Sequence, residues 1–297
     1  MNYPQYTFSV IGGDRRQVYL AEELAHHRNE VRCYALESIP RARMCSDASI
    51  VRQSDSAQEA CVGSDCVIGP LPLCKNDREL NHTLPGRRIL TEELSDALPP
   101  GSFFFAGCIP EKFRRAAEEK QVVVCDFMQD QSLAIRNSIA AAEGAVCEAI
   151  IRSPLNLNGS RCAVLGFGKC GQTLASYLCG MFCHVYVCTD TPEELARAAV
   201  TAQDTGSLYD FAKCVGKFDF IFNTIPAPVI GSGLLRNMKP SVTIIDIASA
   251  PGGVDYEAAG RMGINAAHCL SLPGKYAPAS SAKILRDVIE RTLSTCS

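Results

Sequence analysis

The chain has 297 residues, of which 47% are hydrophobic and 21% are charged, and its formal net charge at pH 7 is −3. This composition is ordinary for a globular α/β protein, and the length suggests about two domains. The near-neutral charge gives no reason to expect nucleic acid or a membrane surface as partner, and no apolar run approaches the ~20 residues that span a bilayer.

The sixteen cysteines lie mostly within apolar runs, and no two of them are spaced as C-x-x-C. We therefore expect free thiols in the core and no metal site. The polar residues 1–7 do not form a secretory signal. Together these features predict a cytoplasmic protein in a reducing compartment.

A strand–helix–strand unit opens the chain, with an apolar strand at residues 8–12, a helical pattern at 15–25 and a second strand at 30–36. The first turn lacks the three-glycine dinucleotide fingerprint. It presents Asp14 and Arg15 at the carboxyl edge of the sheet, where open α/β folds bind their ligands. A solvated turn with ordinary helix caps is the alternative interpretation.

Strands and helices continue to alternate through the first half of the chain. Apolar strands are predicted at residues 66–69, 103–106 and 121–126, and the charged residues 110–120 form a helix between the last two. This alternation is typical of a doubly wound parallel sheet. We therefore predict an N-terminal α/β domain over residues 1–128.

A long helical segment follows over residues 129–152, rich in Ala, Ile and Glu and stopped before Pro154. We expect this helix to link two domains. It contains Gly144, which costs ~1 kcal/mol relative to Ala inside a helix. Close approach of a ligand or another backbone, or a simple helix crossing, would account for this glycine.

The strongest motif of the chain is the G-x-G-x-x-G pattern of Gly166, Gly168 and Gly171. It follows the apolar run at 162–165 and precedes a helical pattern at 172–179. The first glycine permits a tight turn, the second lets the backbone approach a pyrophosphate, and the third lets the helix pack closely on the strand. The free amides of the helix would then face the anionic bridge of a dinucleotide.

The rest of this half completes a Rossmann domain, which we place at residues 153–279. A strand at 184–188 precedes a capping box from Thr191 to Glu194, with proline at the first helical position. Further strands precede small loops, and a final helix at 280–297 is expected to pack back on the first domain. The predicted cofactor contacts are Gly166, Phe167, Gly168, Lys169, Cys170, Gly171, Thr189, Asp190, Thr224, Ile225, Pro226 and Ser249.

The residue that distinguishes NAD from NADP is expected ~20 residues beyond the fingerprint, at the end of the second strand. This position falls on Thr189, with Asp190 one residue later. A hydroxyl accepts a 2′-phosphate more readily than a carboxylate does, because two like charges repel. We therefore expect both cofactors to bind, with a lean to NADP, although Asp190 could serve NAD or simply precede the next helix.

Several motifs resemble those of the dipicolinate synthase A subunit of spore-forming Firmicutes. They occur in order along nearly the whole chain and read IGGDRRQ, NSIAAAEG, VLGFGKCG, FNTIPAPV, DIASAPGGVD and LPGKYAPASSAKIL. The resemblance implies NAD(P)-dependent oxidation of dihydrodipicolinate to pyridine-2,6-dicarboxylate in the mother cell during sporulation. It also implies that the flavoprotein-like B subunit of dipicolinate synthase is a partner, and it is compatible with a homo-oligomer. One departure is Ala140-Ala141, where the family pattern leads us to expect Pro and Thr.

This implied reaction suggests roles for residues in the matching motifs. Cationic or amide donors would hold the substrate carboxylates, and a base would accept the proton. Candidate substrate ligands are Arg15, Arg16, Gln17, Arg136, Asn137, Ser138 and Lys275. Candidate catalytic residues are Glu143, Asp14 and Lys275, with His268 as a less favoured base that we expect to be structural.

Two other classes of function fit the same motifs. A two-domain Rossmann protein can bind NAD(P)H as a redox sensor or scaffold without turnover. It can also be a lyase or hydrolase that keeps its NAD tightly bound. Reduced cofactor that accumulates stoichiometrically with consumed substrate would distinguish a dehydrogenase from both.

Overall fold

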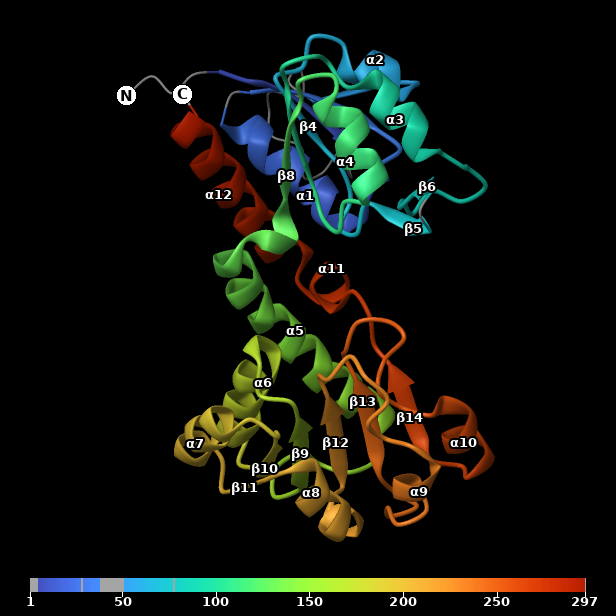
Figure 1. The fold of residues 1–297 in the computed structure, drawn as a ribbon, viewed down its shortest axis with the longest axis vertical. Coiled ribbons are helices and arrows are strands. Elements are labelled where there is room, and N and C mark those ends of the chain that lie inside the picture. The colour runs from blue at the N-terminus through green and yellow to red at the C-terminus, as the bar shows by residue number, and fades with distance from the viewer. Residues whose placement is uncertain (1–4, 28, 38–50, 77, 297) are drawn as a thin grey trace. The chain divides into compact units, whose positions relative to one another are not determined.

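The computed structural model describes residues 5–27, 29–37, 51–76 and 78–296, and the chain forms two compact units (Figure 1). Unit 1 comprises Met1–Ala134 and Ala277–Ser297, and unit 2 comprises Ile135–Tyr276. The expectation about a missing signal rests partly on residues 1–4, which lie outside the described residues. No helix in the described part of the chain has the length and apolar character needed to cross a bilayer.

Unit 1 is built on a six-stranded parallel sheet with the order β3-β2-β1-β4-β7-β8. Its strands are β1 (Thr7–Ile11), β2 (Glu30–Tyr34), β3 (Val51–Gln53), β4 (Cys66–Ile68), β7 (Phe103–Ala106) and β8 (Val123–Asp126). The direction of winding reverses between β1 and β4, which makes the carboxyl ends of these two strands the topological switch point. Open α/β sheets bind their ligands at this point.

Helices cover both faces of this sheet. They are α1 (Arg15–His26), α2 (Ala57–Cys61), α3 (Thr91–Ala97), α4 (Glu111–Glu118) and α12 (Pro278–Cys296), and the unit also holds the hairpin β5 (Cys74–Asn76)–β6 (Glu79–Leu80) and the 3₁₀ turn η2 (Phe127–Gln129). Apolar side chains of α1 and α12 pack on one face, and those of α2, α3 and α4 pack on the other.

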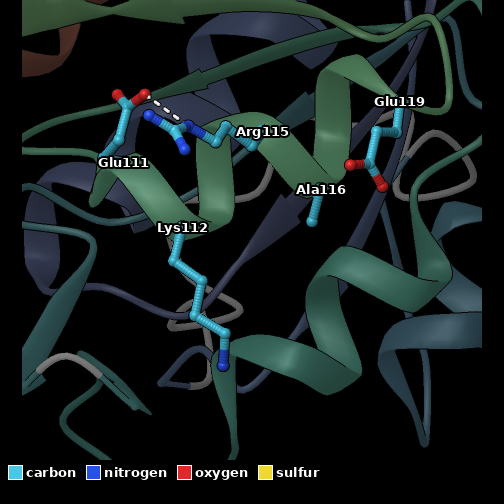
Figure 2. Close-up of a pocket in the computed structure, with 5 residues that line it drawn as sticks. All are labelled: Glu111, Lys112, Arg115, Ala116 and Glu119. Atoms are coloured by element: carbon cyan, nitrogen blue, oxygen red, sulfur yellow. Dashed lines mark hydrogen bonds and ion pairs between the residues drawn. The ribbon is translucent and has the colours of Figure 1, made fainter.

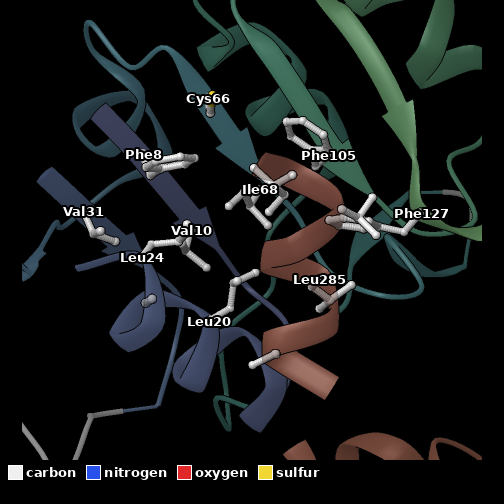
Figure 3. Packing of buried hydrophobic residues seen from close by; sticks show 14 of the residues in the cluster. Phe8, Val10, Leu20, Leu24, Val31, Cys66, Ile68, Phe105, Phe127 and Leu285 are labelled. Atoms are coloured by element: carbon white, nitrogen blue, oxygen red, sulfur yellow. The ribbon is translucent and has the colours of Figure 1, made fainter. Parts of the chain in front are cut away.

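The C-terminal helix α12 is an integral part of the unit 1 core. Leu285 of α12 lies near Phe127, and Leu20 of α1 lies on the other side of the helix in the same cluster (Figure 3). Each of these side chains is at most 1% exposed, and burying one large apolar side chain stabilises a fold by about 1.5–3 kcal/mol. A salt bridge of 2.7 Å from Arg286 to Glu23 also joins α12 to α1.

Unit 2 repeats this architecture with a second six-stranded parallel sheet, in the order β11-β10-β9-β12-β13-β14. Its strands are β9 (Arg161–Leu165), β10 (His184–Cys188), β11 (Asp204–Gly206), β12 (Phe220–Asn223), β13 (Thr243–Asp246) and β14 (Asn265–His268). The switch point lies between β9 and β12, whose residues pair in register from Phe220↔Cys162 to Asn223↔Leu165. The glycine fingerprint follows β9 directly.

The helices of unit 2 again lie on both faces of the sheet. They are α5 (Gln131–Arg152, which begins in unit 1), α6 (Lys169–Gly180), α7 (Pro192–Thr201), α8 (Leu208–Cys214), α9 (Ser232–Leu235), α10 (Tyr256–Arg261) and α11 (Leu272–Tyr276), with the 3₁₀ turn η3 (Val215–Lys217). Side chains of α5 and α6 pack against one face, whereas those of α8, α9 and α10 pack against the other.

The predicted fold class is confirmed: the chain contains two doubly wound parallel sheets, and the second carries the Rossmann glycine turn. Two details of the sequence interpretation are wrong. The segment after β14, expected as a loop, contains the helix α11, and α6 starts at Lys169 instead of Gln172. The three-residue strands β3 and β11 carried no recognisable apolar pattern.

Candidate functional site

The glycine turn of unit 2 connects β9 to α6 and requires glycine at two positions. Gly166 has a φ of +90°, which side chains other than glycine rarely adopt. A Cβ atom on Gly171 would lie closer than 3.0 Å to the carbonyl oxygen of Gly166, a separation that real Cβ atoms do not show. These two glycines therefore let the helix start directly against the end of the strand.

Gly168 faces open space at the start of α6. A Cβ atom at this residue would meet no other atom within 4 Å, and Gly168 is an N-cap without a side-chain hydrogen bond. No acidic residue occupies the first turn of α6. The helix therefore presents uncapped amides and its positive dipole end to an open face, an arrangement that fits the pyrophosphate of a dinucleotide.

The neighbouring strand β12 supports this turn from the side. Thr224 donates a hydrogen bond of 2.9 Å from Oγ1 to the carbonyl oxygen of Leu165, and a Cβ atom on Gly166 would lie 2.5 Å from the same Oγ1. Phe167 is only 3% exposed and packs in the core under the turn. Its side chain thus anchors the turn, so that only its backbone is available to a cofactor.

The end of β10 differs from the sequence interpretation. The capping box predicted between Thr191 and Glu194 is absent, because the Thr191 N-cap has no side-chain hydrogen bond. Instead, the carboxylate of Glu194 accepts a hydrogen bond from Oγ1 of Thr189, which is 5% exposed. Asp190 accepts a hydrogen bond of 2.9 Å from the backbone amide of Leu208. The hydroxyl of Thr189 is therefore already engaged by a carboxylate.

A buried carboxylate organises the loops after β12 and β13. Asp246 is fully buried and accepts four hydrogen bonds, from Asn223 Nδ2, Ala248 N, Gly253 N and Tyr256 Oη, at 2.6–3.0 Å. Gly253 also accepts hydrogen bonds from the loop after β12 through its carbonyl oxygen. Both loops at the carboxyl edge of the sheet, including exposed Ser249, are therefore fixed to one anchor.

His268 belongs to the same cluster. Its Nε2 lies 2.8 Å from the carbonyl oxygen of Ala248, and its ring stacks on Tyr256 with centroids 5.7 Å apart. A Cβ atom on Gly252 would lie 3.1 Å from the same Nε2. These contacts hold the imidazole of His268 within the cluster around Asp246.

The predicted residues of α5 have different environments. Ser138 is 2% exposed and lies 2.6 Å from Thr173 Oγ1, which ties α5 to α6. Glu143 is exposed and accepts a hydrogen bond of 3.2 Å from Tyr177 Oη. Asn137 has a buried Oδ1 without a hydrogen-bond partner. Since buried polar groups are nearly always paired, this oxygen is an acceptor that lacks its donor.

Lys275, a predicted catalytic and substrate-binding residue, forms an ion pair with Glu148 of α5. Glu148 is 4% exposed and also accepts hydrogen bonds from Tyr276 Oη at 2.7 Å and Arg152 Nε at 2.9 Å. Burial alone would raise the pKa of Glu148, but hydrogen bonds from Lys275, Tyr276 and Arg152 outweigh it and lower the pKa to about 2. This cluster holds α11 on α5, where Leu272 and Tyr276 cover Gly144.

Replacing Glu148 with glutamine is expected to destabilise unit 2 by about 2 kcal/mol at neutral pH, because Lys275, Arg152 and Tyr276 lose a buried, charged acceptor. Because folding lowers the pKa of Glu148, its ionised carboxylate stabilises the folded state fully at pH values above the ordinary pKa of 4.5. This stabilisation is lost as the pH falls towards 2. The difference in the free energy of unfolding between wild type and Glu148→Gln, measured by urea titration, should therefore shrink as the pH falls from 4.5 towards 2. Glu257→Gln, which breaks an exposed pair with Arg261, should change stability by less than about 0.5 kcal/mol at every pH.

Unit 1 has its own cluster of predicted residues, at the switch point after β1. Asp14 caps α1 and accepts hydrogen bonds of 2.8–3.1 Å from the guanidinium of Arg16. Arg16 is 6% exposed and also donates to the carbonyl oxygen of Leu71, in the loop after β4. Both side chains are thus committed to joining the two loops, whereas Arg15 is exposed beside them.

Two buried polar side chains flank Gly13 in this cluster, and each has an atom without a partner. Gln17 is fully buried and uses Oε1 for the capping box, which leaves Nε2 unpaired. His82 pairs with Gly13 through an isolated parallel bridge and has an unpaired Nδ1. Burial lowers the pKa of His82, and the positive charge of Lys75 acts in the same direction. Nothing in the sequence around His82 indicates that it lies beside β1, because this position depends on a bridge to Gly13, far away in the chain.

A hollow of about 410 Å³ lies elsewhere on unit 1, along the exposed side of α4 (Figure 2). It is lined by charged side chains, and Glu111 and Arg115 form an ion pair of 2.8 Å there. It contains none of the predicted residues and no unpaired buried group, so we do not regard it as the functional site. Among the described residues, no cluster of His, Cys, Asp and Glu could hold a metal ion.

Comparison with known proteins supports both halves of this description. Residues 7–128 match the N-terminal domain of the dipicolinate synthase A subunit. Residues 136–258 match the D-isomer specific 2-hydroxyacid dehydrogenase NAD binding domain. Over 292 residues the chain is 27% identical to the dipicolinate synthase A subunit of Bacillus subtilis (strain 168), covering 96% of this chain and 95% of the relative.

Solved structures extend the comparison. The crystal structure of the dipicolinate synthase A subunit from Bacillus halodurans superposes with a TM-score of 0.84 at 25% identity, covering 98% of this chain and 99% of that chain. The transhydrogenase of Sinorhizobium meliloti shares the fold, with a TM-score of 0.71 at 16% identity over 96% of this chain and 94% of that one. The chain therefore carries an N-terminal domain of the dipicolinate synthase A subunit type and an NAD-binding domain of the 2-hydroxyacid dehydrogenase type, and it is similar to dipicolinate synthase A subunits over nearly its whole length.

Proposed function

We propose that this protein oxidises dihydrodipicolinate to dipicolinate (pyridine-2,6-dicarboxylate) as the catalytic component of a dipicolinate synthase. The main support is the open glycine turn on the uncapped start of α6, in a chain that is similar over 96% of its length to a dipicolinate synthase A subunit. The ring loses a hydride from one carbon and a proton from another ring atom, and becomes aromatic. When bound, an oxidised nicotinamide cofactor would accept the hydride.

The residues of unit 2 orient the reactants. The glycine turn and α6 would hold the pyrophosphate, and the loops fixed by Asp246 would line the nicotinamide end of the sheet edge. Because aromatisation provides driving force, positioning is the main task of the protein. Of the predicted catalytic side chains, Asp14 and Lys275 are engaged in ion pairs. We therefore assign proton acceptance to exposed Glu143, oriented by Tyr177.

Substrate recognition is proposed for residues whose polar groups still lack partners or are exposed. Gln17 offers an unpaired amide donor for a carboxylate, and Arg15 adds a positive charge at the N-terminus of α1, where the helix dipole also favours an anion. Asn137 offers an unpaired carbonyl acceptor for an N–H or O–H group of the ring. Arg16 and Ser138 would position these groups without contacting the substrate.

The decisive experiment is reconstitution with dihydrodipicolinate and oxidised cofactor, with and without the flavoprotein-like B subunit of dipicolinate synthase. We expect one reduced nicotinamide and one dipicolinate for each substrate consumed. Conversion without net cofactor reduction would favour a lyase or hydrolase. Cofactor binding without any conversion, even when both proteins are present, would favour a sensor or scaffold. The role of the B subunit and an origin in the mother cell during sporulation are part of the same proposal.

The proposed role of Arg15 in substrate binding can be tested by comparison with the adjacent Arg16. Arg15→Gln should raise the apparent substrate constant roughly 10–100-fold and leave cofactor affinity unchanged, because a charge-assisted hydrogen bond contributes about 1.5–3 kcal/mol. Arg16→Gln should instead lower the melting temperature of unit 1, since it removes the link to Asp14 and Leu71. Steady-state kinetics and thermal melts separate the two results. A loss of cofactor affinity in Arg15→Gln would indicate that Arg15 binds the phosphates of the cofactor, and it would contradict the assignment of Arg15 to the substrate.

A further inference from the structure

We infer that Glu194 contacts the adenosine ribose of the cofactor and makes this Rossmann domain selective for NAD over NADP. The inference rests on the proposed use of a nicotinamide cofactor. It reverses the modest preference for NADP that was predicted from the sequence, because that prediction assumed a free hydroxyl at Thr189. The hydroxyl is engaged by a carboxylate instead.

The location of this carboxylate follows from the sheet register. Cys188, the last residue of β10, pairs with Leu165 of β9, and its carbonyl oxygen accepts a hydrogen bond of 2.8 Å from the amide of Gly166. The end of β10 therefore lies directly beside the glycine turn that would hold the pyrophosphate. In a Rossmann domain the ribose next to the adenine reaches the end of this second strand.

The helix that follows β10 brings Glu194 back to the strand end. Glu194 is the third residue of α7, so a capping box with Thr191 would be its ordinary local contact. The side chain forgoes this contact and accepts the hydrogen bond from Thr189 instead. This contact keeps the carboxylate of Glu194 at the end of β10, where the ribose would lie.

The chemistry of this pair favours a ribose with free hydroxyls. The Thr189 hydroxyl donates its single proton to Glu194, so it has none left to donate to a phosphate. Half-buried Glu194 can accept hydrogen bonds from the ribose hydroxyls of NAD. The same negative charge would repel the 2′-phosphate of NADP.

The other charged residues near this position are committed elsewhere. Asp190 is exposed and holds the amide of Leu208 at the start of α8, which gives it a structural role. Arg197, the basic residue of α7, forms an ion pair with Glu193. Glu193 therefore provides a matched control, because it carries the same charge on the same helix and directs it to Arg197 instead of Thr189.

Calorimetric titration of the full chain with NAD⁺ and with NADP⁺ tests the inference directly. We expect the wild type to bind NAD⁺ at least about 10-fold more tightly. Glu194→Gln should weaken NAD⁺ binding roughly 3–10-fold and strengthen NADP⁺ binding about 10-fold, because it removes the charge and keeps the size. Glu193→Gln and Asp190→Ala should leave the NAD⁺/NADP⁺ ratio within about 2-fold of wild type.

Three results would overturn the inference. They are a preference of the wild type for NADP⁺, an equal shift of the ratio in Glu193→Gln, and a loss of NAD⁺ selectivity in Asp190→Ala. Each of these leaves the proposed oxidation intact, because either cofactor can accept the hydride. Absence of binding of both cofactors to the folded wild type would overturn the proposed function together with the inference.

Discussion

Replacing Gly171 with alanine is expected to abolish cofactor binding and to lower the free energy of unfolding by about 2–3 kcal/mol. The added Cβ atom would collide with the carbonyl oxygen of Gly166. Neither atom can rotate away, because the oxygen belongs to the backbone and the position of a Cβ atom is fixed by the backbone. The start of α6 would have to move off the end of β9, which would displace the amides that face the pyrophosphate. Urea denaturation and calorimetric titration with NAD⁺ measure the two effects separately.

Gly168→Ala is the matched control, because it adds the same methyl group to the same turn. A Cβ atom at this residue meets no protein atom within 4 Å, so stability should change by less than about 1 kcal/mol. The methyl group would occupy the face that a pyrophosphate approaches, and NAD⁺ affinity should fall at least about 10-fold. Wild-type stability in Gly171→Ala, or wild-type affinity in Gly168→Ala, would contradict our description of the turn.

Asp246→Ala is expected to cause the largest loss of stability, about 4 kcal/mol. It removes the acceptor of four hydrogen bonds, from Asn223, Ala248, Gly253 and Tyr256, and leaves the buried amides of Ala248 and Gly253 without partners. Each unpaired buried donor costs about 1–3 kcal/mol, and relaxation of the loops recovers part of this sum. Unfolding of the variant followed by circular dichroism measures the loss.

A nearby aspartate provides the comparison for this variant. Asp255 caps α10 with a hydrogen bond of 2.9 Å to the amide of Ala258 and is exposed. Asp255→Ala should therefore cost only about 1 kcal/mol, the usual value of an N-cap. Similar losses of stability in the two variants would show that the buried network around Asp246 contributes no more to stability than a single exposed N-cap.

The parts of the fold that could be predicted from the sequence are those with local signals. Continuous apolar runs marked most strands. The spacing of Gly166, Gly168 and Gly171 marked the cofactor turn, because backbone geometry demands glycine at the first and third of these positions. The helix α11 was missed, since its residues Leu272 and Tyr276 are stabilised by packing on Gly144, far away in the sequence. No window of neighbouring residues contains that contact.

The candidate site was harder to predict, because side-chain partners are chosen by tertiary structure. Lys275 has the charge and the loop position of a substrate ligand, but its partner is Glu148, 127 residues earlier in the chain. His82 gave no signal, as its place beside Gly13 depends on an isolated bridge to the end of β1. Glu194 was misassigned for a different reason: a local capping motif and a contact with Thr189 competed for one carboxylate, and the tertiary contact prevailed.

The position of α12 in the core of unit 1 has a consequence for how a newly synthesised chain folds. One apolar face of the first sheet is closed by side chains that are translated after all of unit 2, among them Leu285 and Ile289. Unit 1 therefore cannot complete its core until unit 2 has been synthesised. Unit 2 is continuous in sequence and can close earlier, which reverses the usual N-terminal-first order of domain folding. Until α12 is synthesised, the nascent N-terminal sheet leaves uncovered an apolar face of the kind that chaperones bind.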